Sequence, residues 1–92
     1  MASVRVEIGR YTDDHQPGFV ECRLTDVDGR VWSFEEKVPV VCAEYLNAAS
    51  QYPQPGSVGC TILGRESDVV RVGVDSLSDY FECRVPASAI EE

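Results

Sequence analysis

The chain has 92 residues, of which 43% are hydrophobic and 26% are charged, the balance of a globular protein rather than a disordered one. A chain of this length predicts one domain, residues 1–92, with little room for a deep catalytic cleft beside its core. Sixteen acidic against eight basic residues give a net charge of −8, which repels nucleic-acid phosphates and anionic membrane surfaces, so neither is an expected partner.

The first strand is predicted over Ser3–Gly9, where apolar and polar side chains alternate. The chain therefore starts without the apolar stretch of a signal peptide, and no run approaches the roughly 20 apolar residues that span a bilayer. We expect a cytoplasmic protein. The polar, turn-forming segment Arg10–Gly18 predicts a loop before a second strand, Phe19–Asp26.

A turn at Val27-Asp28-Gly29 leads into a third strand, and the length of this turn decides which residues oppose each other. A two-residue turn would place apolar Leu24 beside Ser33 and mix the two faces of the hairpin. A three-residue turn with Gly29 in the left-handed conformation keeps the faces separate. The predicted register opposes Asp26 with Arg30, Leu24 with Trp32, Cys22 with Phe34 and, less favourably, Glu21 with Glu35, whose repulsion Arg84 would relieve.

The second half of the chain has weaker signals at its start. Val38–Val41 is predicted to be extended, with its proline at an edge or bend, and 43–49 is a candidate for one or two helical turns. After the turn-rich segment Tyr52–Gly56, three more strands are expected: Ser57–Leu63, Ser67–Asp75 after a turn at Gly64–Glu66, and Leu77–Val85. Roughly six strands predict an all-β domain, either a small six-stranded antiparallel barrel or a barrel-like sandwich.

The tripeptide Glu-Cys-Arg occurs twice, at Glu21–Arg23 and Glu82–Arg84. Antiparallel pairing of these two strands, with Cys22 opposite Cys83, would set each glutamate against an arginine and help to close a barrel. The alternative is that two ordinary strands share three residues by chance.

Four cysteines, Cys22, Cys42, Cys60 and Cys83, allow either two disulfides or a tetrahedral zinc site. They are spaced about twenty residues apart without a Cys-x-x-Cys pair, and three of them fall in phase with apolar strand faces. We therefore predict reduced, buried thiols, with no metal and no cofactor.

The single histidine, His15, lies beside Asp13 and Asp14, a combination that can bind a metal or transfer protons. Adjacent residues of an extended segment point in different directions and no further ligand is evident, so we interpret the segment as a solvated loop. No nucleophile motif and no glycine-rich phosphate loop occurs in the sequence, which argues against an enzyme.

The aromatic residues divide by their positions. Trp32 and Phe34 follow the phase of the core, whereas Tyr11 and Tyr52 fall in predicted loops, where tyrosine is a frequent contact residue of protein interfaces. The candidate binding residues are therefore Tyr11, Asp13, Asp14, His15 and Tyr52.

Four segments, Ile8–Tyr11, Gln16–Cys22, Glu36–Val41 and Tyr52–Gly56, resemble those of small bacterial proteins without an assigned activity. The resemblance implies a bacterial cytoplasmic protein and supplies no catalytic residue. The predicted strands are also similar in architecture alone to the small barrels of translation elongation factors.

Charge, size and the lack of catalytic motifs favour a non-enzymatic protein-binding module, such as an immunity or inhibitor protein whose acidic surface covers a basic partner. The alternative is a homo-oligomeric structural protein that associates through a strand edge near Val38–Val41. A metal-assisted hydrolase using His15, Asp13 and Asp14 is a third hypothesis.

Overall fold

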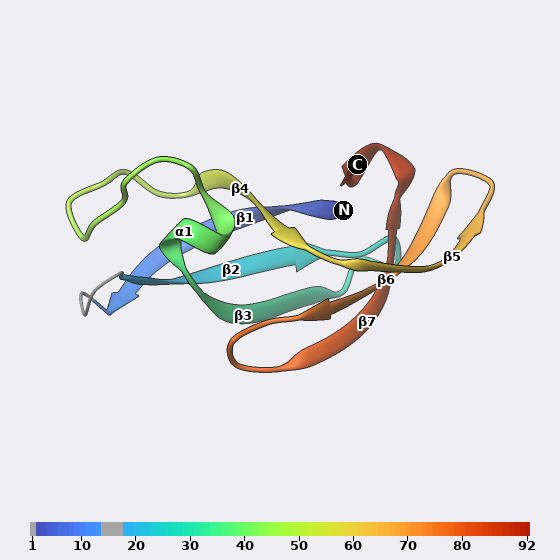
Figure 1. Ribbon diagram of the computed structural model, residues 1–92, viewed down its shortest axis with the longest axis horizontal. Helices are drawn as coiled ribbons and strands as arrows, with labels where there is room; N and C mark the ends of the chain where they lie inside the picture. Colours follow the sequence, from blue (N-terminus) through green and yellow to red (C-terminus); the bar gives the residue numbers. More distant parts are fainter. Residues whose placement is uncertain (1, 14–17) are drawn as a thin grey trace.

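The protein consists of two antiparallel β-sheets curved around one core, in a computed structural model that describes residues 2–13 and 18–92 (Figure 1). The all-β prediction is therefore confirmed. The elements in chain order are β1 (Ser3–Asp13), β2 (Phe19–Thr25), β3 (Val31–Lys37), α1 (Val38–Val41), β4 (Gln54–Gly59), β5 (Thr61–Glu66), β6 (Val69–Asp75), β7 (Tyr80–Pro86), a short 3₁₀ turn (Ala87–Ala89) and β8 (Ile90–Glu91).

The first sheet has the order β3-β2-β1-β4, and the short β8 pairs with β1. Strand β1 extends to Asp13 instead of ending at Gly9, with register shifts after Ile8 and Tyr11 that are typical of bulges. One edge of β1 pairs with β4, and the other is shared by β2 and, at Ser3 and Val4, by β8. Both edges of β1 are thus occupied at its start.

The second sheet has the order β5-β6-β7. The single strand that we predicted over Ser57–Leu63 is divided at Cys60, whose backbone N–H donates to Ala2 at 3.0 Å. The residues before Cys60 belong to the first sheet and those after it begin the second. The turn between β5 and β6 lies at Ser67 and Asp68 rather than at Gly64–Glu66, with Ser67 at a φ of 55°.

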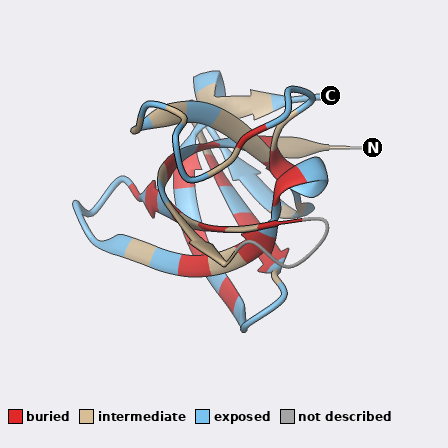
Figure 2. Cartoon of the chain, turned by 90° about the vertical axis from the view of Figure 1, so that its left-hand side faces the viewer, coloured by how far each residue is buried: buried red, intermediate tan, exposed pale blue. Residues whose placement is uncertain are grey.

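The core lies between the two sheets and is built mostly from valine. Figure 2 shows buried and exposed residues alternating along the curved strands that enclose this core. Alternation along the strands explains this division, because successive side chains point to opposite faces. The fully buried side chains are Val4, Ile8, Val20 and Cys22 from the first sheet and Val70, Val72, Val74 and Val85 from the second.

The predicted pairing of the two Glu-Cys-Arg segments is wrong. Strand β2 lies between β1 and β3, and β7 pairs with β6. Arg23 forms its ion pair with Glu7, at 2.7 Å, instead of facing Glu82. Strand β7 reaches only the turn that follows β2, where the Val27 N–H donates to the Arg84 carbonyl at 2.9 Å. The predicted closed barrel is therefore not found within residues 2–13 and 18–92.

The predicted register of the β2–β3 hairpin is confirmed. Leu24 opposes Trp32, Cys22 opposes Phe34, and Gly29 has a φ of 84°. Glu21 and Glu35 also lie opposite each other as expected, but Arg84 is not what relieves their repulsion. Glu21 forms an ion pair with Arg10 at 3.4 Å, and the Thr12 hydroxyl donates to Glu35 at 2.9 Å.

The helix is not where the sequence suggested. Val38–Val41 forms one turn, α1, because proline at the start of a helix has the required φ and loses no hydrogen bond there. The strand edge proposed at this place for self-association is therefore wrong. Segment 43–49 contains no helix, since the Asn47 and Ser50 side chains bind backbone N–H groups in turns.

Candidate functional site

An exposed cluster of apolar and acidic side chains lies where β6 turns into β7. We call Asp75, Leu77, Asp79, Tyr80 and Glu82 the hairpin-tip surface. Leu77 is 49% exposed and Tyr80 is 51% exposed, although both are large apolar residues. In Figure 1 the loop between β6 and β7 projects beyond β3, at the lower edge of the molecule. Two apolar side chains surrounded by three carboxylates therefore face solvent on a projecting loop.

Hydrogen bonds within the loop fix its shape. The Ser76 backbone N–H and hydroxyl both donate to the Asp79 carbonyl, at 2.8 and 2.6 Å. The Asp79 N–H donates back to the Ser76 hydroxyl oxygen at 3.0 Å, and the Tyr80 N–H donates to the Asp79 carboxylate at 2.8 Å. Serine and aspartate commonly stabilise turns in this way. The exposed side chains are thus presented by an ordered backbone.

Two further hydrogen bonds attach the loop to β3. The Glu35 N–H donates to the Ser78 hydroxyl at 3.0 Å. The buried Glu36 carboxylate accepts from the N–H groups of Leu77, at 3.1 Å, and Lys37, at 3.0 Å. A buried carboxylate requires such partners, because an unpaired one would be costly. Glu36 therefore joins the two sheets at the base of the hairpin-tip surface.

Tyr80 lies across the outer side of β6. A Cβ atom added at Gly73 would be 2.5 Å from the Tyr80 hydroxyl oxygen, so the ring end occupies the space that this glycine leaves free. The hydroxyl donates to Glu82 at 2.9 Å, and this hydrogen bond raises the pKa of Tyr80. The ring is thus held between β6 and a carboxylate while half of its surface stays exposed.

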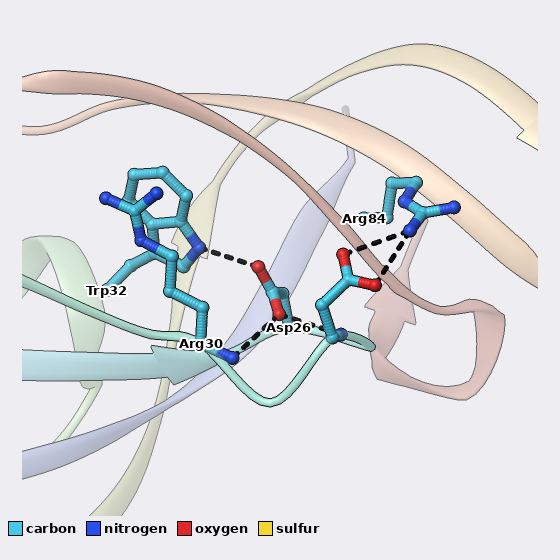
Figure 3. Close-up of polar contacts among 5 residues, drawn as sticks. Asp26, Arg30, Trp32 and Arg84 are labelled. Carbon is cyan, nitrogen blue, oxygen red and sulfur yellow. Dashed lines mark hydrogen bonds and ion pairs between the residues drawn. The ribbon is translucent and has the colours of Figure 1, made fainter.

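A second polar cluster surrounds Asp26, beside the β2–β3 turn (Figure 3). One carboxylate oxygen accepts from the N–H groups of Asp28 and Arg30, at 2.9 and 3.0 Å, and the other accepts from the Trp32 indole at 2.9 Å. The indole hydrogen bond is the main reason why the pKa of Asp26 is lowered. This buried carboxylate organises the turn that sequence periodicity predicted.

Two arginines flank this cluster. Arg84 of β7 donates through one nitrogen to both oxygens of Asp28, at 2.8 and 3.0 Å, and this contact raises the pKa of Arg84. The Arg30 guanidinium lies over the Trp32 ring, 3.8 Å from its centroid. The Trp32 ring also stacks on Phe81, with 4.9 Å between the ring centroids, which ties the turn to the core. A hollow of about 360 Å³ is lined by Asp26, Asp28, Arg30, Trp32, Arg71, Glu82, Cys83 and Arg84.

Three of the binding residues predicted from sequence, Tyr11, Asp13 and Tyr52, lie outside both clusters. Tyr11 and Asp13 lie within the last three residues of β1, and Tyr11 packs against the core. Tyr52 also packs there, and its hydroxyl donates to the Asn47 carbonyl at 2.8 Å. Asp14 and His15 lie outside the described residues, so their predicted role stays untested.

Sequence reasoning missed the hairpin-tip surface, although one signal pointed to it. In β7, Phe81 and Cys83 occupy the buried phase, so Tyr80 and Glu82 had to face outward. The binding residues predicted from sequence do not include Tyr80. The loop contacts of Glu36 could not be found, because they join residues about forty positions apart through side chains.

The cysteines are free, as predicted, and two of them are buried. Burial raises the pKa of the Cys22 thiol to about 12, with Glu36 and Glu21 adding to the effect. Burial likewise raises the pKa of Cys83 to about 11. Cys42 and Cys60 are only half-buried, so the prediction of buried thiols is correct for two of the four.

Cys22 should resist alkylation in the native protein. A shift of the thiol pKa from 9.0 to about 12 reduces the reactive thiolate about a thousandfold at neutral pH. We expect iodoacetamide at about pH 8 to leave Cys22 and Cys83 unmodified over a period that fully modifies all four thiols in urea, as read by peptide mass spectrometry. Rapid native modification of Cys22 would contradict its placement in the core.

No family model matches the chain, and neither a curated protein nor a solved structure matches it significantly. No helix among the described residues has the length and apolar character needed to cross a membrane. Within residues 2–13 and 18–92, no three His, Cys, Asp or Glu side chains gather as metal ligands would.

Proposed function

We propose that this chain is a non-enzymatic protein-binding module whose acidic surface covers a basic partner, in the manner of an immunity or inhibitor protein. The observation that carries the proposal is the hairpin-tip surface: half-exposed Leu77 and Tyr80 surrounded by carboxylates on a projecting, ordered loop. The net charge of −8 adds a long-range attraction toward a cationic protein.

The chemistry of this surface suits a protein interface. Tyrosine is enriched among the residues that dominate binding energy, and Leu77 adds apolar area beside it. Carboxylates around such a centre select partners that carry lysine or arginine at the matching positions and speed their association. Because hydrogen bonds already order the loop, little conformational entropy is lost on binding.

The test is affinity capture from the host at low and moderate salt with three versions of the chain. Tyr80→Ser should weaken capture of a basic partner at least about tenfold, as expected for a central contact residue. Tyr45→Ser is the matched control, since Tyr45 is 77% exposed but lies in the loop after α1. Raising the salt from about 0.05 M to about 0.5 M should also weaken binding, because it screens the charges.

Two results would contradict the proposal. A partner retained equally by wild type and Tyr80→Ser would place the interface elsewhere, and a partner whose binding ignores salt would remove the electrostatic selection. If light scattering instead shows a homo-oligomer, the alternative of self-association gains support. In that case β5 is the edge to test, since the described residues pair with it on one side only.

A further inference from the structure

Two arginines lie directly opposite each other on the outer face of the second sheet. Arg71 of β6 and Arg84 of β7 are register partners, and both are exposed. Like charges in directly opposed positions destabilise a sheet. Asp28 offsets part of the charge of Arg84, but the Arg71 guanidinium has no ion pair or hydrogen bond within the described part of the chain. Arg71 is thus an unbalanced cation beside another cation.

The same two arginines border a hollow of about 260 Å³, which is lined by Gly64, Arg65, Glu66, Val69, Arg71 and Arg84. Three guanidinium groups and one carboxylate line it, but Arg65 is paired with Glu92 and Arg84 with Asp28, so Arg71 is the lining cation without a paired carboxylate among the described residues. At Gly64 a side chain would meet nothing within 4 Å, so that wall is open. Arg71 therefore borders an accessible hollow with its charge unpaired.

Hydrogen-bond donors remain available at this place. Arg84 uses one terminal nitrogen for both oxygens of Asp28, so its other nitrogens have donors to spare. No oxygen among the described residues accepts a hydrogen bond from Arg71, so all five of its donors are available. Opposed residues of an antiparallel pair have Cα atoms about 5 Å apart, a separation at which two guanidinium groups can hold a single anion between them.

We propose that Arg71 and Arg84 form a binding site for an oxyanion, a phosphate or a carboxylate group. The anion would remove the repulsion between the arginines and accept charge-assisted hydrogen bonds from both. This site goes beyond the proposed function, since it selects a negative group and not a basic one. Arg71 and Arg84 also lie four residues along their strands from Asp75 and Tyr80, about 13 Å at the usual rise of a strand.

The test is a titration of the purified chain with inorganic phosphate at about pH 7 and constant ionic strength, followed by NMR of backbone amides and arginine side chains. We expect saturable shifts at Arg71 and Arg84. Arg71→Gln should weaken phosphate binding about tenfold, the effect of losing one charge-assisted contact. Arg10→Gln is the control, because it removes the same charge from an exposed arginine of the first sheet.

A second variant acts in the opposite direction. Asp28→Asn removes the carboxylate that competes for Arg84, so it should tighten phosphate binding several-fold without changing the length of the turn. A parallel titration with succinate separates the two sources of the anion: tighter succinate binding identifies a carboxylate site, and tighter phosphate binding a phosphate site. Either preference supports the site.

Three outcomes would overturn the proposal. One is the absence of saturable shifts up to about 50 mM of either anion, the weak limit of a specific site. The others are equal weakening by Arg71→Gln and Arg10→Gln, which indicates unspecific charge screening, and no tightening with Asp28→Asn. None of these results depends on the partner protein, so the failure of this site and that of the proposed function are distinguishable.

Discussion

Replacement of Asp26 by alanine should lower the free energy of unfolding by about 3 kcal/mol, because three donors lose their acceptor at once. Two of these donors are backbone N–H groups of the β2–β3 turn, and the third is the Trp32 indole, which stacks on Phe81 of the second sheet. For a domain of this size the loss should reduce Tm by about 12 to 24 °C in calorimetry.

Two milder variants separate the contributions around Asp26. Trp32→Phe removes only the indole donor and should cost about 1 kcal/mol beyond any change in packing. Asp26→Asn keeps the size but replaces one acceptor oxygen by a donor, so at least one donor is left unpaired. A loss for Asp26→Ala no larger than that for Trp32→Phe would show that the turn does not depend on this carboxylate.

The same carboxylate predicts a dependence on pH. The folded state lowers the pKa of Asp26, chiefly through the Trp32 hydrogen bond, so the ionised form stabilises the fold. This contribution is fully present above the pKa of the unfolded state, about 4, and is lost as the pH falls through the lower pKa of the folded state. The difference in stability between wild type and Asp26→Asn should therefore be smaller at about pH 2 than at about pH 7.

Replacement of Gly56 by alanine should cost about 2 kcal/mol and lower Tm by about 8 to 16 °C. A Cβ atom at this position of β4 would lie 2.8 Å from the Val41 carbonyl oxygen and 2.8 Å from Cδ1 of Ile8. The carbonyl belongs to the backbone of α1, and Ile8 is fully buried, so neither can move without disturbing its own packing.

Gly73→Ala is the matched control for this strand glycine. Its Cβ atom would be even closer to a neighbour, at 2.5 Å, but that neighbour is the hydroxyl end of the exposed Tyr80 side chain. The ring can rotate away at little cost, so we expect a loss below about 1 kcal/mol. Equal losses in the two variants, measured by urea unfolding, would show that α1 does not pack on Gly56 as described.

Sequence periodicity was sufficient for local structure but not for the arrangement of strands. Alternation identified the buried faces of β1, β2, β6 and β7, and turn chemistry gave the β2–β3 register, because both signals involve residues close in the sequence. The repeated Glu-Cys-Arg suggested a pairing that charge alone could not decide, since Arg10 and Glu7 of β1 offered the same complementarity. Strand order depends on which edges are already filled, and that is a property of the whole sheet.

The candidate site shows the same limit. Tyr11 and Tyr52 were expected in loops. Tyr52 does lie in one, but its hydroxyl is bound to Asn47, whereas β1 continues through Tyr11. Length and polarity of a segment do not reveal a bulge that lets a strand continue. The exposure of Leu77 follows from the bonds that Ser76, Ser78 and Glu36 make across the hairpin, which no local pattern encodes.

In the β6–β7 loop, the hydrogen bonds that set the backbone do not involve the side chains of Leu77 and Tyr80. Ser76 and Ser78 make the bonds that set and anchor the loop, whereas the Leu77 and Tyr80 side chains are largely free to vary. Recognition can thus diverge through substitutions at these two positions while the fold is preserved. The domain is accordingly suited to serve as a scaffold for selecting new binders from a library randomised at Leu77 and Tyr80.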